Sequence, residues 1–178
     1  ELDKRQRKLY VGDSYGRIYS ISVKNGGLIT SFRPHNGEIS SLYFWDTEDF
    51  KYLISSSWDN TVRIYDDSNS VHSASVRFDN IKHRGHVNNI SIKQKPRFIA
   101  SAGDDGTVII TNVRTLRPEA EISDHRAEVQ TCEFLGNNYC LATTDLAGFI
   151  YLWGTFPSYM RNSLIIDIPN TYMSETGQ

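Results

Sequence analysis

One strand–turn–strand pattern occurs four times along this chain, and it limits the possible folds more than any other feature. Its best copy is residues 52–66, where two short apolar runs flank a polar turn around Asn60. The turn residues of the other copies are Gly16, Gly106 and Gly148, so successive copies lie 44, 46 and 42 residues apart. A supersecondary unit that recurs at this spacing predicts an array of similar β-sheets.

Two positions beside each turn are apolar in every copy. The position seven residues before the turn is Leu9, Leu53, Ile99 and Leu141. The position two residues after the turn is Ile18, Val62, Val108 and Ile150. Because side chains alternate between the two faces of a strand, such columns mark residues that face a core.

The repeats divide the chain into four units, 9–32, 35–78, 83–122 and 125–168, which we expect to form one partial domain over residues 1–178. Each unit contains short period-two strand patterns separated by turn residues, and no long amphipathic helix pattern is present. We therefore predict an all-β chain, a β-propeller with about four blades, each a four-stranded antiparallel sheet. A β-sandwich is the alternative, but it would not repeat one pattern in register.

A histidine begins each of the last three units. Apolar residues follow His35 and His125 at four, seven and nine positions. The same spacing holds for His83 and not for His86, and His83 and His125 both lie 23 residues before their turn glycine. We therefore assign His83 to this column, although Gly85 and His86 are the more conspicuous pair.

These residues resemble the WD-repeat β-propeller family. The resemblance rests on residues 55–66, 100–108 and 148–153 together with the histidines, and it covers about residues 9–168. In that family a loop His, a Ser or Thr on the second strand, an Asp in the turn and a Trp on the third strand form a buried hydrogen-bonded network. The resemblance implies that the corresponding residues here are His35, Ser55, Asp59, His83, Ser101, Asp105, His125, Thr143 and Trp153.

The family pattern is incomplete in each unit. Tyr65 and Thr111 stand in the Trp position of the second and third units, and Ala147 stands where the fourth unit should carry Asp. Because buried polar groups need partners, we expect rearranged or hydrated networks at these places.

Four units are fewer than the six to eight blades usual in the family. The end blades of an open arc would expose large apolar faces. We therefore expect the chain to be part of a larger propeller. A complete four-bladed propeller and an arc completed by a separate chain are the alternatives.

An enzyme is not expected. Residues 12–16 match the Gly-x-Ser-x-Gly pattern of a serine nucleophile, but that motif requires a helix after the Ser. A strand pattern follows Ser14, which also lies in the column of the other turns, so a hydrolase that uses Ser14 is the weakest alternative.

No cofactor or metal is expected either. His83 and His86 lack the further ligands that tetrahedral zinc requires, and residues 104–106 lack the rest of a calcium loop. Cys132 and Cys140 are interpreted as reduced thiols.

Charge and hydrophobicity narrow the classes of partner. The formal charge of −2 and pI of about 6.2 argue against nucleic acid, except at the basic run from Lys4 to Lys8. The apolar runs are far shorter than the roughly 20 residues of a membrane span, so no membrane partner is expected. Two cysteines fit a reducing compartment, and we expect a cytoplasmic protein.

We hypothesise a non-enzymatic scaffold that binds other proteins of a multi-subunit assembly and has no small-molecule substrate. The resemblance implies that the face with the histidine loops and hairpin turns carries the partner. On this sequence that face presents Trp58, Arg126, Asn36, Glu38, Arg84, Asn88, Asp104, Glu128 and Leu146. Trp58 and Arg126 are the sharpest candidates, since Trp and Arg dominate interface energetics. The alternative for Trp58 is packing against a neighbouring turn.

Two functional subtypes follow from local sequence. Residues 141–154 are similar to a blade of the large WD-repeat proteins of ciliary axonemes, which implies a structural role in the axoneme. The alternative is a propeller associated with RNA or ribosomes, which would use Lys4–Lys8 and Arg84.

Overall fold

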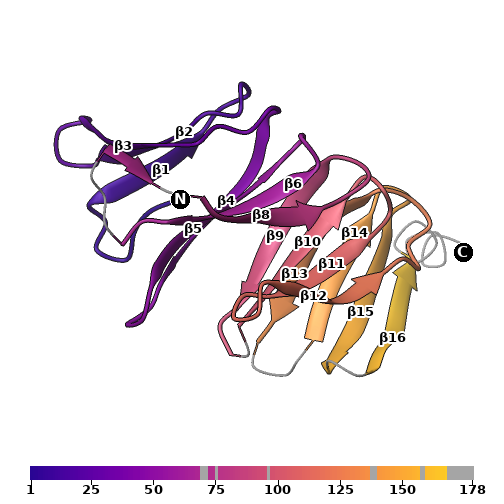
Figure 1. Cartoon of the computed structure of the whole chain (residues 1–178). Helices are drawn as coiled ribbons and strands as arrows, with labels where there is room; N and C mark the ends of the chain where they lie inside the picture. The colour runs from indigo at the N-terminus through magenta and orange to yellow at the C-terminus, as the bar shows by residue number, and fades with distance from the viewer. Residues whose placement is uncertain (69–71, 75, 96, 137–139, 157–158, 168–178) are drawn as a thin grey trace, which may run out of the picture. The chain divides into compact units, whose positions relative to one another are not determined.

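The computed structural model describes residues 1–68, 72–74, 76–95, 97–136, 140–156 and 159–167 (Figure 1). Over these ranges the chain forms sixteen β-strands. The described residues form no helix, and therefore no helix that is long and apolar enough to cross a membrane. The all-β prediction is confirmed.

The strands follow one another closely in sequence. They are β1 (Lys8–Gly12), β2 (Ile18–Ser22), β3 (Leu28–Phe32), β4 (Ile39–Asp46), β5 (Lys51–Ser57), β6 (Thr61–Asp66), β7 (His72–Ala74), β8 (Val76–Lys82), β9 (Val87–Lys93), β10 (Phe98–Gly103), β11 (Val108–Asn112), β12 (Arg117–Ile122), β13 (Val129–Leu135), β14 (Cys140–Asp145), β15 (Phe149–Phe156) and β16 (Tyr159–Asp167).

The strands form four sheets of four strands, as the four repeats predict. The sheet orders are β1-β2-β3-β7, β4-β5-β6-β8, β12-β11-β10-β9 and β13-β14-β15-β16. The recurring hairpin forms β1–β2, β5–β6, β10–β11 and β14–β15, each an antiparallel pair. Each repeat therefore supplies the hairpin of its own sheet.

All four turn residues adopt the same left-handed backbone conformation. The φ angles are 79° at Gly16, 68° at Asn60, 74° at Gly106 and 87° at Gly148. Glycine reaches this region without a steric penalty, and asparagine tolerates it better than most other residues. The four turn residues aligned from the sequence therefore share the same backbone conformation.

The outer strand of the second repeat does not form as one strand at the end of residues 35–78. The structure has two strands there, and residues 71 and 75 lie outside the described part. The short β7 pairs in parallel with β3 of the first sheet, whereas β8 pairs antiparallel with β6. An open sheet edge has unpaired backbone groups that can form hydrogen bonds with another strand. The outer edge of β3 pairs with β7 in this way. The first sheet is therefore not antiparallel throughout.

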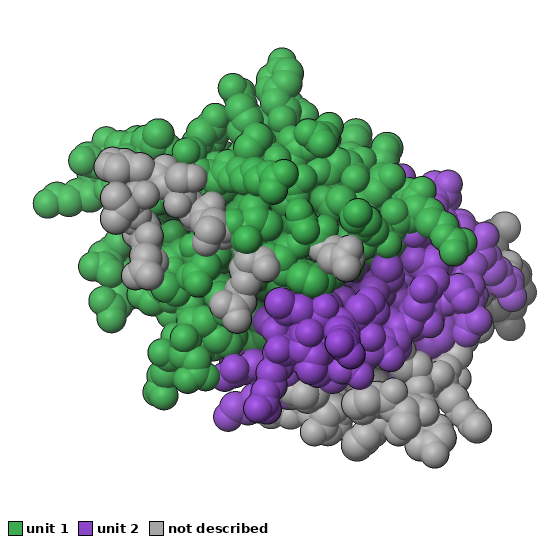
Figure 2. Space-filling model, in the orientation of Figure 1, with its two compact units in different colours: residues 1–90 green, residues 91–178 purple. Residues whose placement is uncertain are grey.

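The chain divides into two compact units, Glu1–Ile90 and Ser91–Gln178, which Figure 2 shows in different colours. The division falls within β9. We describe each unit by itself.

The core of the first unit lies between its two sheets. Tyr10, Ile18 and Phe32 from the first sheet pack against residues that include Leu53 and Tyr65 from the second. Tyr10 stacks on Phe44 of β4, with ring centroids 4.7 Å apart. Such aromatic pairs contribute beyond the area they bury, so this unit depends strongly on its aromatic residues.

The core of the second unit is built in the same way. Ala100, Val108 and Ile110 belong to a cluster that also contains Leu141 and Trp153 of the last sheet. Six of the eight residues in the apolar columns are buried, and Leu9 and Ile150 are half-buried.

Candidate functional site

The most complete polar cluster surrounds His35, on the loop between β3 and β4. His35 is buried, and its Nε2 lies 2.7 Å from the Ser55 hydroxyl on β5. Its Nδ1 lies 3.0 and 2.9 Å from the two carboxylate oxygens of Asp59, in the β5–β6 turn. The structure thus brings together three residues that the family resemblance implies, although they lie up to 24 residues apart.

Asp59 accepts hydrogen bonds from several other groups. Thr61 donates its hydroxyl to Oδ1 at 2.5 Å and its amide at 3.1 Å, and the Asn36 amide donates to Oδ2 at 3.0 Å. Arg63 forms an ion pair with the same carboxylate at 3.5 Å and donates to the Pro34 carbonyl at 2.5 Å. We call His35, Ser55, Asp59, Thr61 and Arg63 the His35 centre.

Electrostatics fix the protonation states in the His35 centre. Burial lowers the pKa of His35 to about 4, and Arg63 acts in the same direction, while Asp59 opposes them only in part. Burial by itself would raise the pKa of Asp59, but the hydrogen bonds from Thr61, Asn36 and His35 hold it below the ordinary value. At neutral pH a neutral imidazole therefore donates from Nδ1 to a carboxylate and accepts at Nε2 from Ser55.

The loop after His35 is locked against the β5–β6 turn. A Cβ on Gly37 would lie 2.7 Å from the Asp59 nitrogen, so only glycine allows this approach. The Ser57 hydroxyl donates to the Gly37 carbonyl at 2.9 Å, and the Trp58 amide donates to the Glu38 carbonyl at 2.9 Å. The turn that carries Trp58 is therefore held by backbone contacts on both sides.

Trp58 lies at the tip of this rigid turn. Its side chain is 46% exposed, and its indole stacks on the imidazole of His86 with ring centroids 5.2 Å apart and an interplanar angle of 7°. Trp58 thus packs against a neighbouring loop and still presents nearly half of its surface. Sequence reasoning missed His86 as its partner, because the repeat assigns His83 and leaves His86 without a role.

The other candidate binding residues of the first unit lie beside or near this pair. Asn36 and Glu38 contact the Trp58–Asp59 turn through their backbones, Asn36 being exposed and Glu38 half-buried. Arg84 is exposed and Asn88 is half-buried, and both lie within two residues of His86 in sequence.

Tyr65 replaces the tryptophan of the family pattern, and it joins the His35 centre through side-chain hydrogen bonds with Ser55 and Arg63. Its hydroxyl donates to the Arg33 carbonyl at 2.8 Å, and its ring packs edge-on against Phe32 at 5.3 Å. Arg63 also belongs to this centre, and it is a residue that sequence reasoning did not select. Its only sequence signal is a charged residue on a strand whose neighbours are apolar.

In the second unit the equivalent cluster surrounds His125. His125 Nε2 lies 2.7 Å from the Thr143 hydroxyl, which also accepts the Trp153 Nε1–H at 2.8 Å. The His125 ring packs against Tyr151 at 4.6 Å and against Trp153 at 5.4 Å. Burial lowers the pKa of His125, and the nearby Asp145 opposes this in part.

Asp145 supplies the carboxylate that Ala147 lacks. It is 5% exposed and accepts the Phe149 amide at 3.0 Å and the Tyr151 hydroxyl at 3.1 Å. The Arg126 amide approaches the same carboxylate at 3.3 Å. Asp145 lies three residues before its turn glycine, the position of Asp13 in the first unit, and this recurrence is the signal that could have identified it. We call His125, Thr143, Asp145, Tyr151 and Trp153 the His125 centre.

Three of the predicted binding residues of the second unit border one surface pocket. The pocket has a volume of about 390 Å³, and Asp104, Arg126 and Glu128 line it. The Arg126 guanidinium lies 4.7 Å above the ring of Phe149, a cation–π contact that holds the charge at the surface. Leu146 is 66% exposed, and its amide donates to the Glu128 carbonyl at 2.9 Å.

The third predicted set, His83, Ser101 and Asp105, has members in both units. His83 is buried in the first unit, and its amide donates to the Asn60 carbonyl at 2.9 Å. In the second unit Ser101 is buried on β10, and Asp105 accepts the Thr107 hydroxyl at 2.7 Å. Thr111, in the Trp position, is fully buried.

The chemical alternatives receive no support from the geometry. Ser14 is exposed in the β1–β2 turn, and β2 follows it in place of the helix that a nucleophile elbow needs. Within the described ranges no three His, Cys, Asp or Glu side chains gather to hold a metal ion. Cys132 and Cys140 are free thiols, and burial raises the pKa of Cys132 far above its ordinary value.

A family model matches two regions of the chain. The model of the WD domain, G-beta repeat, matches residues 26–66 and 78–112. These two regions are WD repeats. The matched regions contain the hairpins of the second and third repeats, which include Asp59 and Asp105.

Several curated proteins are similar in sequence to this WD-repeat chain. Target of rapamycin complex subunit LST8 of Saccharomyces cerevisiae is 27% identical over 77% of the chain and 43% of its own length. Small ribosomal subunit protein RACK1 of Neurospora crassa is 26% identical over 64% of this chain and 35% of its own length. MST50-interacting protein 11 of Pyricularia oryzae is 24% identical over 66% of this chain and 36% of its own length. The chain thus spans about two fifths of the length of these relatives.

Solved structures agree on the fold. A chain of the Mitotic Checkpoint Complex matches with a TM-score of 0.79 at 19% identity, over 91% of this chain and 49% of its own. The computationally designed Ika8 protein matches with a TM-score of 0.76 at 17% identity, over 93% and 48%. The fold is therefore that of WD-repeat propellers, and this chain matches about half the length of each of these two chains.

Proposed function

We propose that this WD-repeat chain is a non-enzymatic scaffold that binds other proteins of a multi-subunit assembly. The observation that carries the proposal is Trp58, which is 46% exposed at the tip of a turn held by hydrogen bonds to the preceding loop. A large aromatic side chain on a rigid backbone loses little conformational entropy on binding, and such residues are typical interface hot spots.

The printed names of the relatives support the same class. They describe a subunit of the target of rapamycin complex, a small ribosomal subunit protein and a protein that interacts with MST50. Each name refers to an assembly or to a protein partner. We infer that this chain also works within an assembly.

Proximity labelling of the tagged chain in cells, followed by binding assays with the purified candidates, tests the proposal. The variant Trp58→Ser should lose at least one direct partner. Leu28→Ser is the matched control, because Leu28 is 64% exposed on β3 and should leave binding unchanged. Equal partner sets for wild type and Trp58→Ser, in variants that unfold at the same urea concentration, would contradict the proposed site.

Association with ribosomes is the second candidate, and the small ribosomal subunit protein among the relatives favours it. The basic run is partly engaged within the chain: Lys8 forms an ion pair with Asp67 at 2.8 Å, and Lys4 donates to the Asp46 carbonyl. Ribosome binding should fall steeply between 50 and 200 mM salt if Lys4 to Lys8 contact phosphates. Absence of co-sedimentation at low salt would exclude this function.

An axonemal role, a cytoplasmic location and hydrolase activity are further proposals from the sequence. An axonemal role requires the protein to co-purify with microtubule doublets, and a cytoplasmic location requires the tagged protein to be found there. Hydrolase activity through Ser14 is the weakest proposal, and a hydrolysis rate that persists unchanged in Ser14→Ala would exclude it.

A further inference from the structure

The chain contains two Asn-Gly pairs, and the structure places them in opposite surroundings. Asn25 and Gly26 lie in the turn between β2 and β3, and Asn36 and Gly37 lie in the loop between β3 and β4. Glycine has no Cβ to shield its backbone nitrogen, so the side chain of a preceding asparagine can approach that nitrogen closely. The local sequence gives both pairs the same reactivity, and only the fold distinguishes them.

The pair formed by Asn25 and Gly26 lies in an exposed turn. Residues 23–28 are all exposed. Gly26 has a left-handed φ of 69°, and no atom lies within 4 Å of the position that a Cβ on it would take. The turn thus leaves room for the Asn25 side chain to close onto the backbone.

A hydrogen bond aligns the Asn25 side chain for reaction with the backbone that follows it. The Gly27 amide donates to Asn25 Oδ1 at 3.1 Å. This Asx turn closes a ring that contains the Gly26 nitrogen, so it holds the side-chain carbonyl carbon near that nitrogen. The Gly27 amide also polarises the carbonyl and would stabilise negative charge on Oδ1 during an attack, as oxyanion-hole donors do.

We propose that Asn25 is a site of spontaneous deamidation in the folded chain. The Gly26 nitrogen gives up its proton and forms a bond to Asn25 Cγ, the bond from Cγ to the side-chain nitrogen breaks, and ammonia leaves with that proton. One water molecule then opens the cyclic imide at either carbonyl, which yields aspartate or isoaspartate. The reaction needs no oxidant or cofactor, and it is independent of the binding role proposed for Trp58.

One hydrogen bond opposes the reaction and should slow it. The Gly26 amide donates to the Ser22 carbonyl at 2.8 Å, and this bond must open before the nitrogen can attack. Opening an exposed turn costs far less than global unfolding. The Ser22 amide donates to the Gly27 carbonyl at 2.8 Å, so β2 and β3 stay joined at the turn while the first bond is open.

The pair formed by Asn36 and Gly37 is held on both sides. The Asn36 amide donates to Asp59 at 3.0 Å, and the Gly37 carbonyl accepts the Ser57 hydroxyl at 2.9 Å. A Cβ on Gly37 would lie 2.7 Å from the Asp59 nitrogen, so this close packing prevents the backbone rotation that ring closure requires. We therefore expect Asn36 to react only when the loop detaches from the β5–β6 turn.

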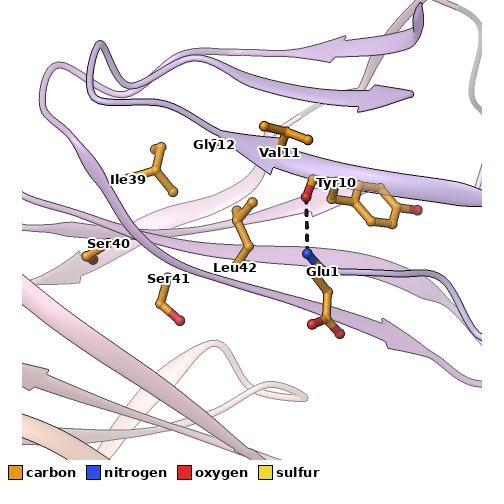
Figure 3. A pocket seen from close by; sticks show the side chains of 8 residues that line it. All are labelled: Glu1, Tyr10, Val11, Gly12, Ile39, Ser40, Ser41 and Leu42. Atoms are coloured by element: carbon orange, nitrogen blue, oxygen red, sulfur yellow. Dashed lines mark hydrogen bonds between the residues drawn. The ribbon is translucent and has the colours of Figure 1, made fainter. Parts of the chain in front are cut away.

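The consequences of the modification should stay local. A neutral amide becomes a carboxylate, which changes the formal charge of the chain from −2 to −3, and isoaspartate adds a methylene group to the backbone of the turn. The contact of the first sheet with β4 should persist, since the pocket of about 440 Å³ between β1 and β4 is lined by none of residues 22–28 (Figure 3). The urea concentration at the unfolding midpoint should therefore change little.

Incubation of the full chain at mildly alkaline pH, followed by peptide mapping with tandem mass spectrometry, tests the proposal. Asn25 should convert at least about tenfold faster than Asn36, because Asn36 must first undergo local opening. In urea the two rates should become similar, since both residues precede glycine. Equal rates in the folded chain would overturn the proposal, and so would an unmodified Asn25 after a time that converts it fully in urea.

Two substitutions identify the reacting residue. Asn25→Gln should abolish the modification of this turn, because the longer side chain would have to close a larger ring. Asn36→Gln is the matched control and should leave the rate at Asn25 unchanged. A mass increase in the same peptide that persists in Asn25→Gln would contradict the proposal. Trp58→Ser should also leave the rate at Asn25 unchanged, so a failure of the proposed binding function is distinguishable from a failure of this site.

Discussion

The His35 centre and the His125 centre occupy equivalent places in the repeat and are stabilised by different interactions. The His35 centre relies on charge, since a carboxylate in the turn accepts from the imidazole, a hydroxyl, an amide and an arginine. The His125 centre relies on aromatic packing, with Tyr151 and Trp153 stacked at 5.7 Å beside the histidine. The two centres thus share the contact between the histidine Nε2 and a strand hydroxyl, and they differ in what surrounds the rest of the ring.

The largest effect should come from removing the aromatic support of the His125 centre. Trp153 is 1% exposed, and Trp153→Ala should lower the free energy of unfolding by about 4 kcal/mol, because it leaves a cavity and removes one of the two hydrogen bonds of the Thr143 hydroxyl. Urea unfolding followed by circular dichroism measures this. Trp58→Ala is the matched control and should cost far less, since Trp58 is exposed. Similar losses in both variants would show that Trp153 is not central to the fold.

Removing the carboxylate should have the next largest effect, and the loss of stability should differ between the two centres. Asp59→Ala should cost about 3 kcal/mol, because it leaves His35 and Arg63 buried without their acceptor. Asp145→Ala should cost less, about 2 kcal/mol, since Asp145 accepts only from neutral donors. Chemical denaturation of both variants gives the comparison. A larger loss for Asp145→Ala would contradict the charge-based account of the His35 centre.

The pH dependence of stability should report the His35 centre directly. The pKa of His35 is lowered to about 4 in the folded chain, so the unfolded chain binds its proton first as the pH falls below about 6.5. The stability that the neutral ring contributes is present above that value and is lost as the pH approaches 4. Between pH 7 and pH 5 this linkage predicts a loss of about 2 kcal/mol.

His35→Gln provides the control for this pH effect. The variant should be less stable at pH 7, and its stability should fall less between pH 7 and pH 5. Part of the slope should remain, because the pKa of His125 is lowered in the same direction. Parallel stability profiles for wild type and variant would show that His35 does not bind its proton in this range.

The smallest effect concerns two buried threonines that occupy different positions of the repeat. Over the described residues the buried hydroxyl of Thr111 has no hydrogen-bond partner, so Thr111→Val should be neutral or stabilising by up to about 1 kcal/mol. Thr143→Val should instead cost about 2 kcal/mol, since its hydroxyl serves both His125 and Trp153. Thermal unfolding of the pair measures the difference, and a destabilised Thr111→Val would reveal a partner for that hydroxyl.

Much of the His35 centre was predictable because its members fall in repeating columns. The spacing identified the histidine column, and the family resemblance implied that Ser55 and Asp59 contact His35, as the distances show. Arg63 was not predictable in the same way. Its column contains no other arginine, and only the packed structure shows that its head group reaches back to Pro34 and Asp59.

Asp145 and His86 illustrate the same limit. Asp145 takes over the carboxylate role two residues before Ala147, which depends on where the Tyr151 hydroxyl lies after folding. His86 packs beneath Trp58 although 28 residues separate them, and neither belongs to the recurring network. Pairings of this kind depend on loop paths, which have no periodic signal.

The sequence by itself determined the hairpins, their registers and the apolar columns of this WD-repeat chain. These features follow from local rules, namely side-chain alternation along a strand and the left-handed turn that glycine and asparagine accept. The tertiary structure alone decided that β7 joins β3, that Asp145 replaces a missing turn carboxylate, and that His86 packs against Trp58. Those outcomes depend on which distant backbone and polar groups become neighbours, and on the free energy of leaving them unpaired.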